Sequence, residues 1–408
     1  KASPMKGLYS TYSFFPVLRV DNYSITNNFA ERIKPGFYFV TSDILDRYQL
    51  FAGITSNYNL DRDIILNFEI KNRLPIFYSL GLKPILGVEF YNISRTAKTD
   101  VYLSKRDDGS YDYQTKVKIN FDLWEVDFRL KHYVFSPADY LEFRYAISKY
   151  FSNIHSFINP IDNTPILGLR EAYYEGNNYQ IKYEFNLENH YIDGDISPEN
   201  IRMMLKYDFE NSKLNPQYEV NDKNELKYVY KNYNFHRIET NILYSKRLYN
   251  SHTAGINLRL GTILNERVPD FYDFYLGGLI GLKSYPFYSI SGNNIASMNI
   301  FYRFPILKNI DQSLYILYLD KIFGSVYFDY GYAWNGVTTK ETLNKFVKGV
   351  GGEIRFKFNS YYMFPTAVFV NAAYGLDRYN KYIETTKTYI NYGKEIQLYF
   401  GVLFDFAF

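Results

Sequence analysis

The sequence contains few sets of residues whose types and spacing could carry out a reaction. Cysteine is absent, and the histidines show no metal-ligand spacing; they are His132, His155, His190, His236 and His252. We therefore expect no metal site. The sequence also has no Gly-x-Ser-x-Gly elbow, P-loop or dinucleotide fingerprint. It predicts a protein that is not an enzyme and that needs no cofactor.

The residues that stand out chemically lie in residues 275–305, YLGGLIGLKSYPFYSISGNNIASMNIFYRFP. Three glycines between residues 277 and 281 permit backbone conformations closed to residues with a Cβ. The tip that follows consists of Leu282, Lys283, Ser284 and Tyr285. Long loops between strands are usually polar and solvated, whereas this one combines glycines, aromatic residues and one cation. We expect residues 264–294 to form a lid loop that folds back into a hollow.

The composition indicates what kind of hollow this would be. Of 408 residues, 45 are Tyr and 34 are Phe, and the mean hydropathy is −0.31. No run approaches the roughly 20 apolar residues that a membrane-spanning helix needs. Alternating apolar and polar residues with many aromatics is typical of strands that face lipid on one side and a wet lumen on the other. The sequence predicts an all-β transmembrane antiparallel barrel, and its net charge of +3 gives no reason to propose nucleic acid as a partner.

Alternation along the chain predicts about sixteen strands, within a single barrel domain of residues 1–408. They cover residues 8–20, 35–44, 48–58, 64–70, 84–94, 114–130, 141–147, 168–187, 201–209, 228–248, 252–263, 296–304, 322–332, 346–358, 364–375 and 395–408. The lid loop follows the eleventh strand. Long polar connections (95–113, 211–227, 335–345 and 378–394) alternate with mostly short ones, as outer loops alternate with periplasmic turns. The apolar parity changes at Leu123/Trp124, which predicts a β-bulge there.

The last strand, residues 395–408, carries a second signal. Apolar residues occupy alternate positions up to a C-terminal Phe. This pattern resembles the recognition signal by which bacterial assembly machinery captures outer-membrane proteins; the alternative is a simple amphipathic terminal strand. The residues that would carry the signal are Tyr399, Gly401, Phe404, Phe406 and Phe408.

The lid loop and the chain after it resemble the bacterial surface-antigen superfamily that includes the BamA, TamA and FhaC-type barrels. In that family the lid carries a Val/Leu-Arg-Gly-Phe/Tyr tip, where this chain has residues 282–285, LKSY. Residues 275–278 (YLGG), 302–305 (YRFP), 326–334 (VYFDYGYAW) and 349–355 (GVGGEIR) are similar to further family segments. The earlier strands agree in layout only, which is also similar to the barrels that follow TolB-like propellers.

The resemblance implies a clamp between the lid and the barrel wall. In the family, the tip arginine pairs with acids that face the lumen. Here Lys283 replaces the arginine, and Asp329 shares its parity with Tyr327 on the lumen side. Lysine lacks the bidentate fork of arginine, so a looser clamp is expected. A second acid of the family falls near Asn299; Glu353 and Arg355, which face the lumen by parity, could serve instead, or all of these could be ordinary lumen charges.

A barrel closes by pairing its first strand with its last, and this seam is the second expected functional element. Pro16 would remove a hydrogen bond from the first strand, and Gly401 would soften the last. A weak seam could open sideways and offer an edge to an incoming strand. The alternative is that Pro16 lies at a harmless end of its strand.

The resemblance implies a BamA-type protein that inserts or translocates proteins in the outer membrane of a diderm bacterium. The alternative is a passive pore, or an anchor for a periplasmic domain or partner complex. Expected partners are outer-membrane lipid and lipopolysaccharide, with client outer-membrane proteins or periplasmic or lipoprotein subunits as further candidates. The opening residues, KASP, lack the apolar core of a secretory signal, so we expect a mature form or part of a longer protein. Any periplasmic domain would then lie outside this chain.

Overall fold

The computed structural model describes residues 9–404, except 22–28, 46, 72–76, 78, 106–110, 160–162, 190–193, 195, 216–217, 221–225, 265–267, 316, 361–363 and 384–387. Two of the residues of the predicted terminal signal, Phe406 and Phe408, lie outside this range. The chain forms two compact units. Unit 1 contains residues 1–182 and 208–236, and unit 2 contains residues 183–207 and 237–408. Within the described residues, no helix has the length and apolar character that crossing a membrane requires.

The strands form one large antiparallel sheet of 17 strands. One of these, β19 (Gln312–Leu314), is a three-residue strand beside β20, and the others are the sixteen long strands that the sequence predicts. The recorded pairings of the described residues run from β1 to β25 and do not close the sheet. The prediction of an all-β fold with about sixteen strands is confirmed.

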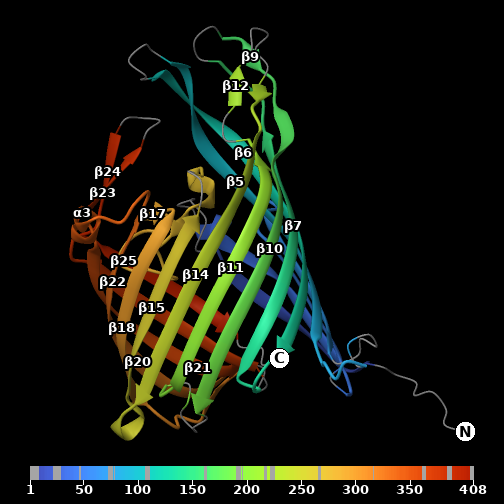
Figure 1. Ribbon diagram of the computed structural model, residues 1–408, viewed down its shortest axis with the longest axis vertical. Coiled ribbons are helices and arrows are strands. Elements are labelled where there is room, and N and C mark those ends of the chain that lie inside the picture. The colour runs from blue at the N-terminus through green and yellow to red at the C-terminus, as the bar shows by residue number, and fades with distance from the viewer. Residues whose placement is uncertain are drawn as a thin grey trace, which may run out of the picture. The chain divides into compact units, whose positions relative to one another are not determined.

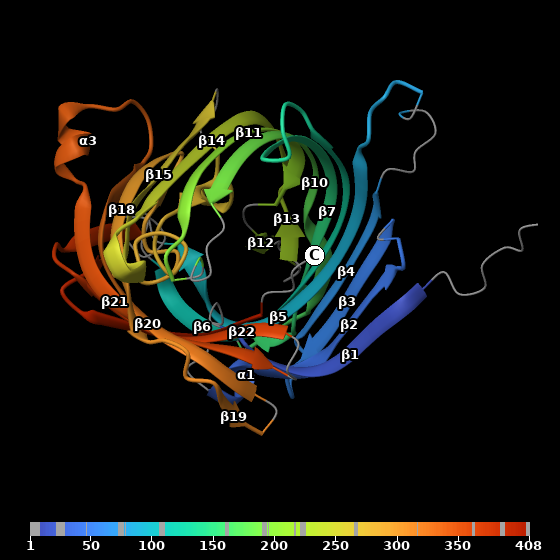
Figure 2. The ribbon, with the colours of Figure 1, turned by 90° about the horizontal axis from the view of Figure 1, so that it is seen from below.

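Unit 1 contains the first seven long strands, and Figure 2 shows β1 to β4 lying side by side. They are β1 (Tyr9–Val20), β2 (Ile33–Asp43), β3 (Tyr48–Ser56), β4 (Arg62–Lys71), β5 (Ile85–Lys105), β6 (Tyr111–Tyr133) and β7 (Asp139–Ile154). Smaller elements are α1 (Phe29–Arg32), β8 (Phe157–Ile158), β9 (Pro165–Ile166), β12 (Tyr218–Val220) and β13 (Leu226–Tyr228). Three strands contribute residues to both units: β10 (Leu169–Asn189), β11 (Glu199–Leu214) and β14 (Lys231–Arg247).

Unit 2 contains the remaining long strands, which Figure 1 draws from yellow to red. They are β15 (Thr253–Leu264), β18 (Asn294–Leu307), β20 (Leu317–Trp334), β21 (Val347–Ser360), β22 (Phe364–Gly375) and β25 (Ile396–Phe404). The short elements are β16 (Phe274–Tyr275), β17 (Ser291–Gly292), β23 (Tyr379–Ile383), β24 (Thr388–Tyr392), α3 (Lys340–Asn344), η1 (Tyr249–Ser251) and η2 (Asp270–Tyr272). Because β15 is the eleventh long strand, the predicted lid loop does follow strand eleven.

Each unit has a polar face and an apolar face because successive strand residues point to opposite sides. In unit 1, Arg144 on β7 binds Asp127 at 2.7 Å and Glu125 at 2.8 Å, both on the polar face of β6. Trp124 and Phe128, which have the other parity, are exposed. Ion pairs on one face and exposed aromatic rings on the other match a wall between water and lipid.

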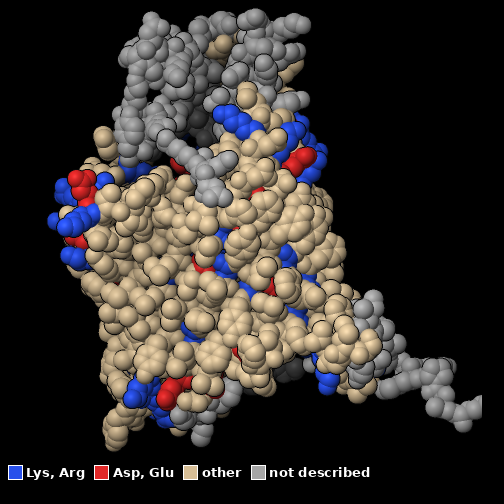
Figure 3. All heavy atoms as spheres, in the orientation of Figure 1, with Lys and Arg blue, Asp and Glu red and all other residues tan. Residues whose placement is uncertain are grey.

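The same division holds in unit 2. On β20, Tyr327 and Asp329 are buried on the polar face, whereas Val326 on the apolar face is 51% exposed. On β25, Leu398 is 74% exposed, whereas Tyr399 is buried. Figure 3 shows charged atoms gathered around α3, with a largely tan surface over β15 and β18. An uncharged band of exposed apolar side chains is the surface that lipid requires.

The predicted β-bulge at Leu123/Trp124 is wrong. The register of β6 is unbroken through these residues against both β5 and β7. The apolar residues change face instead: before this point, Val117 and Ile119 pack with Ile154 in a buried cluster on the polar face. In the sequence, a local core on one face followed by exposed aromatic residues on the other produces the same change of apolar parity as a β-bulge.

The predicted long polar connections contain more regular structure than expected. Strands β5 and β6 continue into residues 95–113 and pair from Ile85↔Lys131 to Lys105↔Tyr111. Residues 211–227 include the end of β11 and the strands β12 and β13, residues 335–345 include α3, and residues 378–394 include β23 and β24. Threonine, valine and tyrosine favour strands even where the polar pattern suggests a loop, so the strands extend beyond the alternating segments.

Candidate functional site

The lid loop lies on the polar face of unit 2. Figure 2 shows the gold segment between β15 and β18 on the concave side of β18, β20 and β21. A two-residue ladder between β16 and β17 closes its base, with Phe274 opposite Gly292. Leu276, Leu282 and Ile290 are fully buried. The loop is therefore packed like a core element, as its glycine and aromatic content predicts.

Hydrogen bonds within the loop fold its tip into a compact turn. Gly278 has a φ of 97°, which favours glycine, and its N–H donates to the carbonyl of Tyr285 at 2.9 Å. The N–H of Leu282 donates to the carbonyl of Leu276 at 2.6 Å. A Cβ on Gly277 would collide with the carbonyl of Pro286. The glycines thus allow the two arms of the loop to approach each other and present the tip to the sheet.

The structure brings the tip to Asp329, chiefly through the backbone. The N–H of Lys283 donates to Asp329 Oδ2 at 3.2 Å, and Asn299 Nδ2 donates to Asp329 Oδ1 at 2.5 Å. Asp329 is only 1% exposed. A buried carboxylate is stabilised when several donors converge on it, so this contact holds the loop, β18 and β20 together.

The Lys283 ammonium lies over an aromatic ring. Its Nζ is 4.0 Å from the centroid of the Tyr327 ring, a favourable cation–π distance. The Tyr327 hydroxyl donates to Asn371 Oδ1 at 2.7 Å, which fixes the ring beneath the cation. The expected clamp between the cation and the wall thus takes the form of a backbone hydrogen bond and a cation–π contact.

Ser284 packs against β21 at Gly349, which has no side chain. Its side chain is fully buried, and a Cβ on Gly349 of β21 would overlap its hydroxyl. Among the described residues, Ser284 Oγ has no hydrogen-bond partner. The loop can therefore approach β21 this closely only because residue 349 is a glycine and has no Cβ.

Tyr285 anchors the tip to three segments of unit 2. Its side chain is 0% exposed, and its hydroxyl lies 2.9 Å from the carbonyl of Asp377 and 3.2 Å from that of Lys348. The Tyr399 hydroxyl donates to the Tyr285 carbonyl at 3.4 Å. Burial raises the pKa of the Tyr285 phenol, so it stays neutral and can donate. Tyr285 links the loop to β21, β25 and the β22–β23 connection.

A second anchor lies at the base of the loop. Lys381 of β23 donates to the carbonyl of Tyr288 at 3.2 Å and to Ser291 Oγ at 3.4 Å. Asp273 beside it is 7% exposed. Burial raises the pKa of Asp273 to about 7, helped by the nearby charge of Asp270 and opposed by Lys381, Ser291 and Arg237. This carboxyl group titrates near neutral pH.

Two further predicted partners lie apart from the tip contacts. Arg355 binds Glu353 on the same strand, with Nε 2.9 Å from Glu353 Oε1. Its guanidinium lies 5.7 Å from the ring centroid of Phe323 and 5.8 Å from that of Phe369. Asn371 donates weakly to Glu353 at 3.5 Å. Asn371 and the Tyr327 hydroxyl connect this pair to the tip.

The seam residues occupy the two terminal strands of the sheet. Pro16 lies within β1, opposite Phe37 of β2, and not at the strand's end. Gly401 of β25 lies opposite Phe369 of β22, whose ring would be 2.7 Å from a Cβ at this position. Of the predicted terminal signal, Tyr399 is buried on the polar face, and Phe404 ends β25.

Sequence reasoning missed several residues of this site. The Tyr327 ring, Gly349 and the carbonyl acceptors of Lys348 and Asp377 were not predicted as partners of the loop. The glycine run at residues 349–352 was a usable signal, because a strand glycine often marks the close approach of another backbone. The role of Tyr327 depends on the path of the loop, which parity alone does not specify.

Comparison with solved structures relates this fold to outer-membrane barrels. CdiB from Escherichia coli matches with a TM-score of 0.56 and 10% identity, over 98% of this chain and 63% of that one. BamA from Haemophilus ducreyi lacking POTRA domains 1–3 matches with a TM-score of 0.51 and 10% identity, over 97% of this chain and 76% of that one. CdiB from Acinetobacter baumannii matches with a TM-score of 0.50 and 9% identity, over 96% of this chain and 60% of that one.

These likenesses concern the fold. No protein-family model matches the sequence. No curated protein sequence matches it either. The chain has the fold of the BamA and CdiB outer-membrane β-barrels, as the resemblance in the sequence predicts, and it spans less than two thirds of the length of the CdiB chains.

Proposed function

We propose that this chain is the barrel of an outer-membrane protein that inserts or translocates other proteins. The observation that carries the proposal is the loop after the eleventh strand, which is docked by its tip on the polar face of a BamA- and CdiB-like fold. A loop held by buried contacts covers part of the polar face of unit 2, which a simple diffusion pore would leave open to water. The same fold and the exposed apolar face support an outer-membrane location.

In the proposed mechanism, the polypeptide client meets the terminal strands. Among the described residues, β1 pairs with β2 and β25 pairs with β22, so each strand has an edge that could pair with another strand. Pro16 cannot donate a backbone hydrogen bond, which weakens any pairing at that position. A client strand would add to such an edge by β-augmentation, while the docked loop limits leakage through the interior.

The test is insertion of a client into liposomes that contain the purified chain. A small, urea-unfolded outer-membrane barrel protein would be added, and its protected fraction after protease treatment would be followed with time. We expect faster insertion than in empty liposomes. Equal rates, together with a large steady single-channel current, would instead identify a passive pore; equal rates without a current would identify a membrane anchor.

A further inference from the structure

Arg303 of β18 lies on the polar face of unit 2 without an acidic partner. Its guanidinium is 4.9 Å from the ring centroid of Phe301, two residues earlier on the same strand. In the part of the chain that the structure describes, no carboxylate lies within ion-pair distance of it. An aromatic ring attracts a cation through its face but does not occupy the N–H donors of a guanidinium as a carboxylate does. Those donors are therefore available to a further acceptor.

The charged residues that act on Arg303 do not neutralise it. Glu353 and Arg355 of β21 both influence its guanidinium electrostatically, with opposite signs. Glu353 is already bound by Arg355, whose Nε lies 2.9 Å from Glu353 Oε1. Two guanidinium groups and one carboxylate leave one positive charge in this group of three residues. An anion bound at Arg303 would balance that charge.

The strand register places a hydroxyl group on each side of Arg303. Arg303 lies opposite Thr253 of β15 and opposite Ser325 of β20. Directly opposite residues have Cβ atoms about 5 Å apart, so both hydroxyls lie close to any ligand of the guanidinium. Thr253 is fully buried, and its Oγ1 has no hydrogen-bond partner among the described residues. Because a buried hydroxyl without a partner is unfavourable, a ligand oxygen at this position would be stabilising.

The donors at this position favour a carboxylate as the ligand. A guanidinium presents its N–H groups in a planar fork that matches the two oxygens of a carboxylate. One uncompensated positive charge also matches the single charge of a carboxylate better than the two charges of a phosphate. Arg303 and Ser325 are partly exposed, so a small ligand can reach the guanidinium from the polar face.

We infer that Arg303 and Thr253, which we name the β15–β18 anion site, bind a carboxylate. The guanidinium holds both oxygens, and the Thr253 hydroxyl donates to one of them. The carboxylate belongs either to a free organic acid or to an acidic side chain of a polypeptide on the polar face. The inference goes beyond the proposed function and does not rest on it, because it concerns only the polar face of unit 2.

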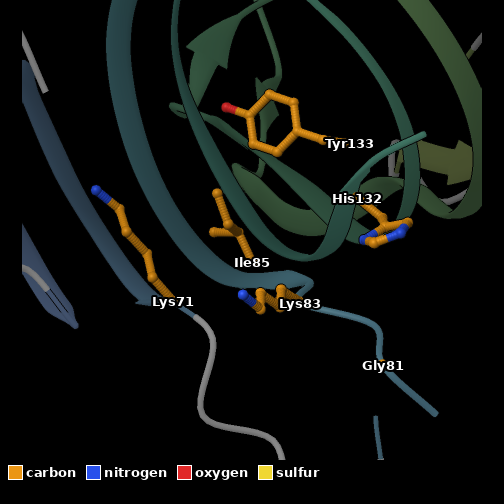
Figure 4. Close-up of a pocket in the computed structure, with 6 residues that line it drawn as sticks. All are labelled: Lys71, Gly81, Lys83, Ile85, His132 and Tyr133. Atoms are coloured by element: carbon orange, nitrogen blue, oxygen red, sulfur yellow. The ribbon is translucent and has the colours of Figure 1, made fainter. Parts of the chain in front are cut away.

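A cavity in unit 1 supplies a matched control. Its volume is about 500 Å³, and Figure 4 shows Lys83 and His132 among the side chains that line it. Lys83 is exposed. Lys83→Gln removes one positive charge, as Arg303→Gln does, but at a concave position in the other unit. Comparison of these two variants therefore separates binding at Arg303 from a general attraction of anions to the protein.

The probe is the tripeptide Ala-Glu-Ala with both ends blocked, so that the glutamate carboxylate is its only charge. Binding to the detergent-solubilised full chain is followed by saturation-transfer difference NMR at constant ionic strength. We expect saturable binding of this peptide and none of the neutral Ala-Gln-Ala peptide. Arg303→Gln should raise the Kd about tenfold, or roughly 1.4 kcal/mol. Thr253→Val should raise it about fivefold, or roughly 1 kcal/mol, and Lys83→Gln should bind like the wild type.

Competition with acetate identifies the source of the carboxylate. A Kd for acetate similar to that of the Ala-Glu-Ala peptide would indicate a site for a free organic acid. A Kd for acetate at least about tenfold higher, a difference of roughly 1.4 kcal/mol, would indicate that the carboxylate is carried by a polypeptide. Both results support the inferred chemistry of the β15–β18 anion site.

Three outcomes would overturn the inference. One is an unchanged Kd in Arg303→Gln or in Thr253→Val. Another is an equal loss of affinity in Lys83→Gln, and the third is equal binding of the neutral peptide. Thr253→Val changes no charge, so it tests the site even if Arg303→Gln does not fold. Because no client is used here, a failed liposome insertion assay with intact peptide binding would contradict only the proposed function.

Discussion

At the residue scale, one buried carboxylate organises the docked loop. Asp329 accepts hydrogen bonds from the Lys283 backbone and from Asn299, while the Lys283 ammonium contacts the Tyr327 ring. Parity in the sequence predicted that Asp329 and Tyr327 share a face. It could not predict that the backbone of Lys283 would reach the acid, because that depends on the turn that the loop glycines permit.

These contacts predict unequal effects of two substitutions. Lys283→Ala removes a cation–π contact worth about 0.5–2 kcal/mol. Asp329→Ala leaves two donors unpaired, at about 1–3 kcal/mol each. We expect both variants to release the loop and raise single-channel conductance, with the larger rise for Asp329→Ala. Lys340→Ala, on the exposed α3, is the control, and unchanged conductance in both loop variants would contradict the clamp.

Asp273 predicts a pH dependence at the base of the loop. Its folded-state pKa of about 7 lies above the usual value of about 3.9. The folded state therefore binds more protons between these values, so stability falls as pH rises from about 4 to 7. At about 1.4 kcal/mol per pKa unit, the cost at pH 8 is of order 4 kcal/mol.

Asp273→Asn removes this cost, because the amide cannot ionise. We expect the variant to have a higher Tm than the wild type at pH 8 and a clearly smaller advantage at pH 5, measured by circular dichroism. Asp311→Asn, in an exposed turn, serves as the control for loss of one carboxylate. A Tm difference that does not grow between pH 5 and pH 8 would show that Asp273 is not the titrating group.

At the element scale, the sequence predicted the strands better than their connections. All sixteen long strands and the loop after strand eleven were expected from alternation. The prediction of a bulge in β6 was wrong because Val117 and Ile119 form a local core on the polar face. Apolar residues in this part of β6 therefore do not mark the lipid-facing side. The extension of β5 and β6 was missed because residues 95–113 are polar and do not alternate in polarity.

The β21 glycines allow a matched test of loop docking. A Cβ on Gly349 would overlap the Ser284 hydroxyl, whereas the nearest atom to a Cβ on Gly352 is 3.4 Å away. We expect Gly349→Ala to displace the tip and Gly352→Ala to leave it docked. The rate of trypsin cleavage after Lys283 measures the difference. Cleavage should be faster in Gly349→Ala than in the wild type and unchanged in Gly352→Ala. Equal cleavage in both would mean that Gly349 does not set the approach.

At the scale of the whole molecule, the apolar face predicts where charge is not tolerated. Val326 is exposed on that face of β20. A lysine on the lipid face of a barrel costs about 2–4 kcal/mol near the bilayer midplane and less near the interfaces. We expect Val326→Lys to lower the urea midpoint for folding into bilayers. The control Val326→Leu should have the same midpoint as the wild type. An unchanged midpoint for the lysine variant would place Val326 away from the hydrocarbon core.

The central claim is that the terminal strands act on a client, and a reversible lock between them tests it most directly. The chain has no native cysteine, so pairs placed in β1 and β25 form the only disulfide. In the liposome assay, we predict that oxidation of such a pair stops client insertion and that reduction restores it, while each single-cysteine variant stays active. Full insertion by the oxidised, cross-linked protein would contradict the account.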